Sequence, residues 1–333
     1  MKYVLTGATG FIGANLLHRL LKDGHEVHCI IRKPNLCVEN TSAHLHQIPL
    51  TENAADIERL ARVMEGCDGV FHVAGIFDPS PEGEMRMLNL HVFGTRALLR
   101  AAEKARVPKF ITCSSSVTVC FGSKDQLGTE DSWFDPTPVY GKTGALRAYY
   151  NSKLQSEDIT LGWRGVNTLV VNPDYIIGPW DIKPTSGQLI VTMARRWIPF
   201  YPLGGKCFLG VEDCIDAFLA AMEKGRVGQR YLLGHHNLSY QEFMTATAKV
   251  IGGRGPKLPL PNVALGMLGK IGELGARIDQ HRFAGLDKQV LLAMQQDRYR
   301  SGQKMRQELN ISPRPIEDSI ESAYRWFVDQ GYC

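Results

Sequence analysis

Tyr149 and Lys153 are the two residues of this chain whose types and spacing most directly suggest chemistry. They stand four positions apart in a predicted helix, so both side chains lie on one face. A tyrosine hydroxyl ordinarily ionises near pH 10, and a nearby ammonium favours the phenolate, which makes the hydroxyl a usable proton shuttle. Bringing that ionisation close to neutral pH requires about 4 kcal/mol of differential stabilisation. The spacing is common by chance, so its weight depends on the glycine loop and the serine cluster that precede it.

The glycine loop is the segment 6–13, which reads TGATGFIG. It follows a predicted strand and opens a predicted helix, as a dinucleotide-binding turn must. Its first glycine permits the tight turn, the second lets the backbone approach a pyrophosphate, and the third lets helix and strand pack closely. The helix N-terminus offers free N–H groups to the anion. The alternative is an ordinary tight connection between strand and helix. The expected cofactor contacts here are Gly7, Thr9, Gly10, Phe11, Ile12 and Gly13.

The end of the second predicted strand bears on the choice between NAD and NADP. An NAD site usually places an acid there, on the ribose hydroxyls of the adenosine. This chain has Arg32 and Lys33 instead, and two cations suit a 2′-phosphate. We therefore predict NADPH as the cofactor. The alternative is that these are solvated surface charges, and it applies most directly to Lys33.

Strands and helices alternate in the first half of the chain, which predicts a parallel sheet with helices on both faces. The predicted strands are 2–6, 26–31, 45–48, 69–73, 110–113 and 167–171. The predicted helices are 11–22, 54–65, 84–104 and 144–162.

The pattern loosens after Pro173, where prolines and glycines become frequent. One further strand is predicted at 229–233, and helices at 240–250, 263–278, 287–295 and 316–329. We predict a cofactor domain over 1–173 with a return segment near 205–235. The remainder of 174–333 forms a smaller, mixed substrate lobe at the carboxyl edge of the sheet, where ligands bind in such folds.

Composition excludes several classes of protein. The chain has 333 residues, 44% of them hydrophobic, and a net charge of +4. It can bury a core, and so mild a charge predicts no nucleic-acid partner. The eight cysteines form no CxxC pair and no zinc spacing, so we expect reduced thiols and no metal. With neither a bilayer-length apolar run nor a signal peptide, we expect a cytoplasmic protein without a membrane partner.

The chain resembles the extended short-chain dehydrogenase/reductase family over nearly its whole length. The resemblance rests on the glycine loop, the FHVAG segment at 71–75, Ser114–Ser116, the Tyr149/Lys153 pair, and the NP and IGP motifs at 172–173 and 177–179. It implies a Rossmann-type doubly wound α/β fold, in which a serine polarises a carbonyl, the tyrosine exchanges its proton, and the lysine also holds the nicotinamide ribose. By analogy the catalytic residues are Ser116, Tyr149 and Lys153, with Ser115 as the fallback serine. Further cofactor contacts are expected from Val73, Ala74, Gly75, Ser114, Tyr149, Lys153 and Pro173.

Within the family, the segments 171–185 and 226–239 look like those of the branch that contains dihydroflavonol reductases and proteins described as hopanoid-associated sugar epimerases. Three departures stand out. His91 replaces an Asn that often begins an N-V-x-G-T run. No acid follows the third strand, in the segment 48–51, where the family often has one near the adenine. Lys206 stands where nucleotide-sugar enzymes usually have an arginine, and lysine contacts phosphate only as a point charge.

These features favour an NADPH-dependent reductase of a ketone or aldehyde in a small-molecule substrate. Large apolar residues that could line a cleft would make that substrate bulky and apolar; they are Phe77, Trp133, Phe134, Trp180, Met193, Trp197, Phe200 and Tyr201. The alternatives are a nucleotide-sugar epimerase or dehydratase with a tightly held cofactor, and a non-catalytic NADP sensor or scaffold. A homodimer through the helices 84–104 and 144–162 is what the family resemblance suggests.

Overall fold

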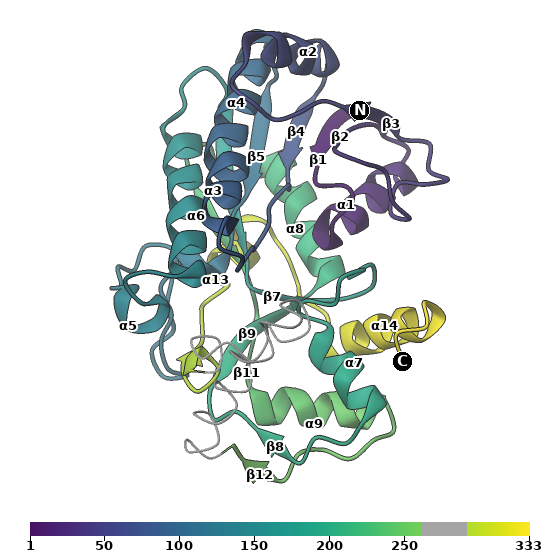
Figure 1. Ribbon diagram of the computed structural model, residues 1–333, viewed down its shortest axis with the longest axis vertical. Coiled ribbons are helices and arrows are strands. Elements are labelled where there is room, and N and C mark those ends of the chain that lie inside the picture. Colours follow the sequence, from purple (N-terminus) through teal and green to yellow (C-terminus); the bar gives the residue numbers. More distant parts are fainter. Residues whose placement is uncertain (261–291) are drawn as a thin grey trace.

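Seven parallel strands form the central sheet of the computed structural model, which describes residues 1–260 and 292–333. Their order across the sheet is β10-β6-β5-β4-β1-β2-β3, and Figure 1 labels the strands β1 to β5 of this sheet. The order reverses between β1 and β4, so the carboxyl ends of these two strands frame the crevice where a doubly wound sheet binds its ligand. The strands are β1 (Lys2–Thr6), β2 (Glu26–Ile31), β3 (His44–Gln47), β4 (Gly69–His72), β5 (Lys109–Cys113), β6 (Asn167–Pro173) and β10 (Arg230–Leu233).

Helices cover both faces of this sheet (Figure 1). On one face, α1 (Phe11–Lys22) and α8 (Val211–Lys224) contribute to one large apolar cluster. On the other face, α2 (Ala54–Met64), α4 (Thr95–Lys104) and α6 (Ala145–Gly162) share a second cluster. The inner strands are buried on both faces; β4, for example, has four buried residues in a row, as a parallel sheet between two helical layers requires. The fold is therefore the predicted Rossmann-type doubly wound α/β sheet.

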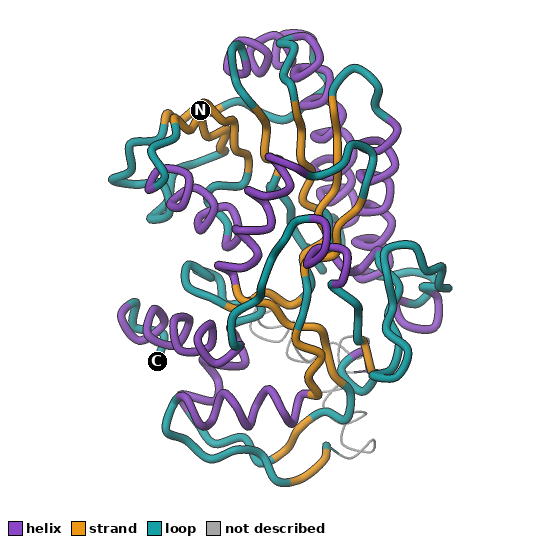
Figure 2. The backbone as a smooth tube through the Cα atoms, turned by 180° about the vertical axis from the view of Figure 1, so that it is seen from behind, coloured by secondary structure: helices purple, strands orange, loops and turns teal. Residues whose placement is uncertain are grey.

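A second, mixed sheet lies beyond the carboxyl edge of the first (Figure 2). It contains β7 (Tyr175–Ile177), β9 (Gly205–Gly210), β11 (His236–Ser239) and β13 (Asp297–Arg298). The helices α7 (Gln188–Arg195), α9 (Tyr240–Val250) and α14 (Ile316–Asp329) bury apolar side chains against it. Phe208 of β9 and Phe243 of α9 stack with their ring centroids 4.3 Å apart at the centre of this packing. The short strands β8 (Phe200–Tyr201) and β12 (Leu258–Pro259) pair beside α9.

The helix expected at 84–104 differs from the prediction. The structure has α3 (Gly83–Leu88), then a π-helical stretch over Asn89–Gly94, then α4. A π-helix turn is wider than an α-helix turn and often marks a functional site. Here it contains His91, one of the departures noted from the sequence.

The other predicted elements of the first half agree with the structure within two residues at each end. The sequence did not predict α7, α8, β7, β9 and β11, nor the short helices α5 (Thr137–Tyr140) and α13 (Gln303–Glu308). The predicted helix 263–278 and most of 287–295 lie outside the described residues. Across the described part of the chain, no helix combines the length and the apolar content that a bilayer crossing needs.

Candidate active site

The glycine loop joins β1 to α1 at the carboxyl edge of the sheet. Gly7 has a φ of +80°, and a Cβ there would lie 2.6 Å from the backbone nitrogen of Ala74. A Cβ on Gly13 would lie 2.0 Å from the carbonyl oxygen of Gly7. Neither position can hold a side chain, because the loop packs directly on α1 and on the segment after β4. Gly10, in contrast, is exposed, and a Cβ on it meets nothing nearer than 3.4 Å.

This open space beside Gly10 fits the pyrophosphate of a dinucleotide. Gly10 is the N-cap of α1 and provides no side-chain cap. The first N–H groups of an α-helix have no partner within it, so those of Phe11 and Ile12 are left for an anion. The hydroxyl of Ser114 at the end of β5 is buried without a hydrogen-bond partner among the described residues, which leaves a further polar atom at the same edge for a ligand.

Arg32 and Lys33 follow β2 directly and are both exposed. Within residues 1–260 and 292–333, neither side chain makes an ion pair. Two residues later, the Asn35 side chain donates to the carbonyl oxygen of Thr9 over 3.0 Å. This bond ties the segment after β2, to which Arg32 and Lys33 also belong, to the glycine loop.

Lys153 lies where α6 meets the ends of β4 and β5. It is buried, and its Nζ donates to the carbonyl oxygen of Cys113 over 3.1 Å. The same Nζ is 6.0 Å from the centroid of the Tyr149 ring. A Cβ on Gly75 would come within 2.9 Å of it, so any side chain at 75 would displace the ammonium. The structure thus brings the tyrosine and the lysine together beside the segment 73–75.

The three serines have different surroundings. Ser115 is the N-cap of the 3₁₀ turn Ser116–Thr118, and its side chain accepts a hydrogen bond from the Val117 N–H. Ser116 is 8% exposed, and its hydroxyl makes no hydrogen bond to any residue that the structure describes. The capping role occupies the Ser115 side chain, whereas the hydroxyls of Ser114 and Ser116 remain available. Pro173, the last predicted contact, is buried at the end of β6.

Glu157, which the sequence analysis missed, fixes the serine turn to the helix. It lies one turn beyond Lys153 on the same face of α6 and is 1% exposed. Its carboxylate accepts hydrogen bonds from Thr118 over 2.5 Å and from Asn172 over 2.7 Å, and it pairs with Arg230 at 3.1 Å. The turn that carries Ser116 is thereby held against the helix that carries Tyr149 and Lys153. The spacing of positions 149, 153 and 157 was the signal in the sequence that could have revealed it.

Two buried histidines, His72 and His91, lie next to the site; the sequence analysis noted both within family motifs but gave neither a role. His72 Nδ1 lies 2.7 Å from the Thr6 hydroxyl, and His72 Nε2 lies 3.0 Å from the Thr95 hydroxyl. Burial lowers the pKa of His72 to about 3, and the charge of Lys153 acts in the same direction. Burial and Lys153 also lower the pKa of His91 to about 2, with His72 contributing. Both imidazoles are therefore neutral at physiological pH.

Several large apolar residues were expected near the substrate. Among the described residues, Phe77 is the only one of them whose ring contacts the Tyr149 ring. Its ring meets the Tyr149 ring edge to face at 5.6 Å, and it is 45% exposed. Trp180 instead stacks on His18 at 4.4 Å. The others are spread over small clusters or the surface: Met193 and Tyr201 lie beside α9, Phe134 packs on Tyr140 and Tyr150, and Trp133, Trp197 and Phe200 are exposed.

Lys206 on β9 belongs to a cluster of cations in the smaller part of the molecule. Its Nζ lies 4.8 Å from the centroid of the Tyr175 ring. Burial lowers its pKa to about 7, and the nearby charge of Arg298 contributes. Arg298 is itself buried, and its Nε lacks a hydrogen-bond partner in the described structure. Arg300 pairs with Asp174 at 2.6 Å, so among the described residues this cluster holds more cations than carboxylates.

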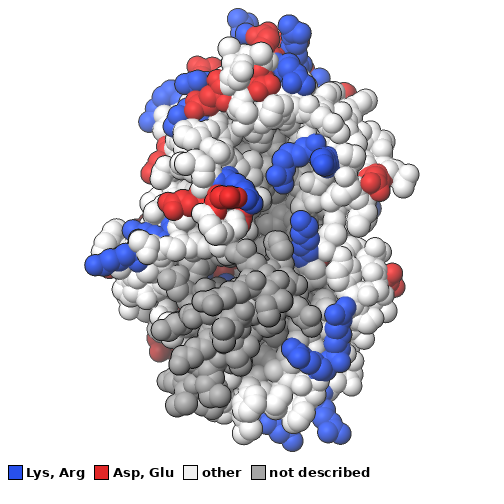
Figure 3. Space-filling model, in the orientation of Figure 1, with Lys and Arg blue, Asp and Glu red and all other residues white. Residues whose placement is uncertain are grey.

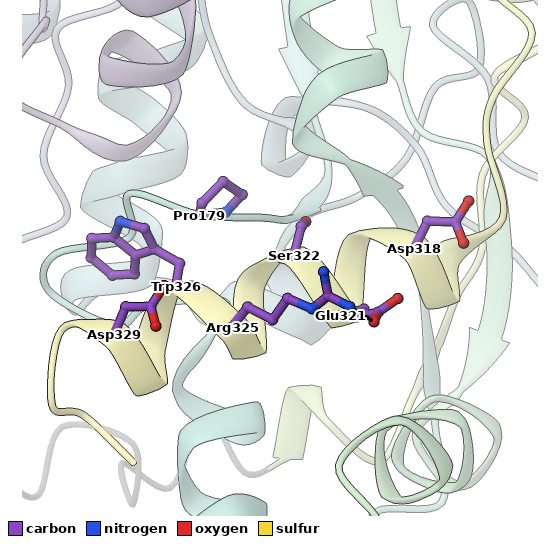
Figure 4. A pocket seen from close by; sticks show the side chains of 7 residues that line it. All are labelled: Pro179, Asp318, Glu321, Ser322, Arg325, Trp326 and Asp329. Carbon is purple, nitrogen blue, oxygen red and sulfur yellow. Dashed lines mark hydrogen bonds and ion pairs between the residues drawn. The ribbon is translucent and has the colours of Figure 1, made fainter.

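A hollow of about 430 Å³ along α14 is separate from the site around Tyr149 and Lys153 (Figure 4). Its lining includes Asp318, Glu321, Arg325 and Trp326, and Arg325 is paired with Glu321. None of the residues predicted to be catalytic lines it.

On the face shown in Figure 3, basic side chains lie in separate groups.

A family model described as the NAD dependent epimerase/dehydratase family matches residues 3–234. The chain belongs to this family. The resemblance to extended short-chain dehydrogenases/reductases is thereby confirmed, and members of the NAD dependent epimerase/dehydratase family use a nicotinamide dinucleotide, which the loop geometry fits.

The names of similar proteins differ between the sequence relatives and the solved structures that share the fold. A protein of Synechocystis sp., provisionally named dihydroflavonol 4-reductase, is 30% identical over 99% of this chain and 95% of its own length. Sterol demethylase protein B of Methylococcus capsulatus is 25% identical over 99% of both chains. The crystal structure of gox2253 matches with a TM-score of 0.81 and 27% identity, covering 99% of this chain and 98% of its own. A nucleoside-diphosphate-sugar epimerase from Pseudomonas aeruginosa, PA4631, shares the fold with a TM-score of 0.75 and 24% identity, over 100% of this chain and 99% of its own.

Proposed function

We propose that the protein is an NADPH-dependent reductase that acts on a ketone or aldehyde of a bulky, largely apolar small molecule. The observation that carries the proposal is the position of Lys153, whose ammonium lies beside the Tyr149 ring and at the sheet edge where the glycine loop opens. Phe77 provides an exposed aromatic wall at the same tyrosine. The relative named as a dihydroflavonol reductase supports reduction of an aromatic ketone.

In this mechanism Ser116, Tyr149 and Lys153 each have a separate role in the reduction of the carbonyl. The glycine loop and Arg32 would hold NADPH, which when bound would provide the hydride for reduction of the carbonyl carbon. The Ser116 hydroxyl donates a hydrogen bond to the carbonyl oxygen and stabilises the negative charge that develops there. Tyr149 donates its phenolic proton to that oxygen, and the ammonium of Lys153 stabilises the phenolate that remains.

A nucleotide-sugar epimerase or dehydratase is the second candidate, and one observation favours it. The cluster of Lys206, Arg298 and Arg300 holds more positive charge than Asp174 neutralises. A diphosphate placed beside it would restore the charged form of Lys206, whose pKa burial has lowered to about 7. An apolar ketone offers no such compensation.

Cofactor retention and net NADPH use separate the two candidates. We expect the purified protein to emerge from gel filtration largely without nucleotide and to oxidise added NADPH with members of a panel of aromatic ketones and aldehydes. The absorbance of NADPH measures this directly. A protein that keeps its nucleotide through gel filtration, and consumes no NADPH with any carbonyl, is the result expected of the epimerase.

Arg32→Ala tests the cofactor assignment. Hydrogen bonds to a charged group contribute about 1.5–3 kcal/mol, so loss of the 2′-phosphate contact should weaken NADPH binding by about 10- to 100-fold. NADH lacks this phosphate and should bind with nearly unchanged affinity. Fluorescence titration with both nucleotides measures the ratio, with Lys33→Ala as the neighbouring comparison. Equal losses for NADPH and NADH would refute the assignment of NADPH.

The serine pair gives a second, internally controlled prediction. Ser116→Ala should lower kcat/KM by about 100- to 1,000-fold, because the carbonyl oxygen loses a hydrogen-bond donor in the transition state. Ser115→Ala should instead destabilise the fold by about 1 kcal/mol, since it removes a cap, and should leave kcat of the folded protein nearly intact. Steady-state kinetics and urea unfolding of both variants are the measurements. The reverse pattern would move the catalytic role to Ser115.

A further inference from the structure

His91 makes two hydrogen bonds to segments that are far apart in the chain. Its Nε2 accepts from the Ile76 N–H over 3.1 Å, and its Nδ1 lies 2.9 Å from the Ser152 hydroxyl. The backbone N–H can only donate, so Nε2 carries no proton and the neutral ring is protonated at Nδ1. Nδ1 therefore donates to Ser152, whose hydroxyl in turn donates to the carbonyl oxygen of Tyr149 over 3.0 Å.

This chain of bonds connects two parts of the candidate active site. Ile76 belongs to the segment after β4 that also contains Gly75 and Phe77. Ser152 lies between Tyr149 and Lys153 on α6. His91 itself is 1% exposed, and its ring meets the Tyr149 ring edge to face at 5.8 Å.

The backbone around His91 is shaped for this contact. The helix widens into π-helical turns over Asn89–Gly94, and His91 is within this stretch. The Thr95 hydroxyl donates to the His91 carbonyl oxygen over 2.6 Å, and Thr95 also contacts Ser156 on α6 at 3.0 Å. The π-helical stretch is thus fixed to the same helix that carries the tyrosine and the lysine.

We propose that His91 is a positioning residue, a neutral imidazole that bridges the segment after β4 and the Tyr149–Lys153 turn of α6 and holds the phenol and the ammonium at their working separation. This inference rests on the proposed proton transfer by Tyr149. An asparagine at this position could replace Nδ1 as the donor to Ser152, but its shorter side chain could not also reach Ile76.

The charges that face His91 explain why it acts as a neutral group. Lys153 and Tyr149 face it from α6, and His72 faces it from β4. Burial, the charge of Lys153 and the neighbouring His72 together lower its pKa to about 2. A protonated ring would also direct an N–H at the Ile76 N–H, which removes that hydrogen bond.

Three variants test the proposal: His91→Asn, His91→Gln and His91→Ala, with the exposed His44→Asn as the matched control. The first readout is the ionisation of Tyr149, measured as the tyrosinate absorbance difference between each variant and the same variant carrying Tyr149→Phe. Loss of the bridge should move the midpoint of this absorbance titration upward in His91→Ala, because the ammonium of Lys153 would no longer be held beside the phenol. It should move less in His91→Asn and His91→Gln, which each restore one of the two bonds.

The second readout is kinetic. A displaced catalytic group costs up to about 100-fold, so kcat should fall by about 100-fold in His91→Ala and by about 10-fold in the two conservative variants. In His44→Asn, the kcat, the Tyr149 titration and the NADPH affinity should all stay within about twofold of those of the unchanged protein. A merely structural histidine would lower the urea midpoint of the variants and leave the Tyr149 titration unmoved, and that result would overturn the proposal. The titration requires no turnover, so a protein that reduces no carbonyl would refute the proposed function without deciding the role of His91.

Discussion

Tyr149→Phe should lower kcat for carbonyl reduction by about 100- to 10,000-fold, the range that proton transfer by a positioned side chain contributes. At about 1.4 kcal/mol per factor of ten, this corresponds to about 3–5 kcal/mol of lost transition-state stabilisation. The phenylalanine keeps the ring that packs against Phe77 and His91, so the site retains its shape. The affinity for NADPH should change by less than about twofold.

Tyr150→Phe is the matched control, because it removes the same atom one residue further along the helix. The Tyr150 ring points away from the site, into a cluster with Tyr140 at 5.7 Å and Phe134 at 6.0 Å. Burial raises the pKa of its hydroxyl, which makes it a poor proton donor. Rapid mixing with NADPH and a ketone gives kcat for both variants. A Tyr149→Phe enzyme within threefold of the unchanged protein, or an equal loss in Tyr150→Phe, would contradict the assignment of the proton donor.

The first half of the fold was predictable because its elements are defined by local sequence. The strand Lys2–Thr6 and the helix Phe11–Lys22 were predicted with the bounds that the structure has. Their apolar periodicity and the glycine turn between them agree, and such agreement between levels is what makes a local prediction reliable. The position of Tyr149 and Lys153 on one face followed from the same kind of local geometry.

The second sheet was not predictable in this way, for a physical reason. β9 (Gly205–Gly210) continues into α8 at Val211 without a turn, so no break in the sequence marks the change from strand to helix. β13 has only two residues and exists because it pairs with β9. Such strands depend on partners distant in sequence, and local propensity gives little information about them.

The roles of His72 and His91 were not predictable for the same reason, because they depend on segments distant in sequence. The sequence marked His91 as unusual, but its π-helical backbone and its bonds to Ile76 and Ser152 depend on segments 15 and 61 residues away. His72 was noticed only as part of a family motif. Its neutral state comes from complete burial, which a sequence does not reveal.

These two histidines should make the protein strongly sensitive to acid. Folding lowers the pKa of His72 to about 3 and that of His91 to about 2, from an ordinary value near 6.5. Below pH 6.5 these two histidines are protonated in the unfolded chain but stay neutral in the folded chain. The free energy of unfolding therefore falls as the pH falls. Between about pH 7.5 and about pH 5, each histidine should cost about 2 kcal/mol of unfolding free energy, and the pair about 4 kcal/mol.

The variant His91→Asn isolates one half of this effect. It removes one of the two histidines that bind a proton only in the unfolded chain, and it leaves the other titrating groups in place. Urea unfolding at the two pH values should show the loss of stability reduced by about 2 kcal/mol relative to the unchanged protein, while His44→Asn should show the full loss. The carboxylates of Glu130, Asp181 and Asp213, whose pKa burial raises, act in the opposite direction in both proteins and cancel in the comparison. An acid-induced loss of equal size in His91→Asn and the unchanged protein would mean that His91 takes up its proton in the folded state, and the bridge from Ile76 to Ser152 could not then persist in acid.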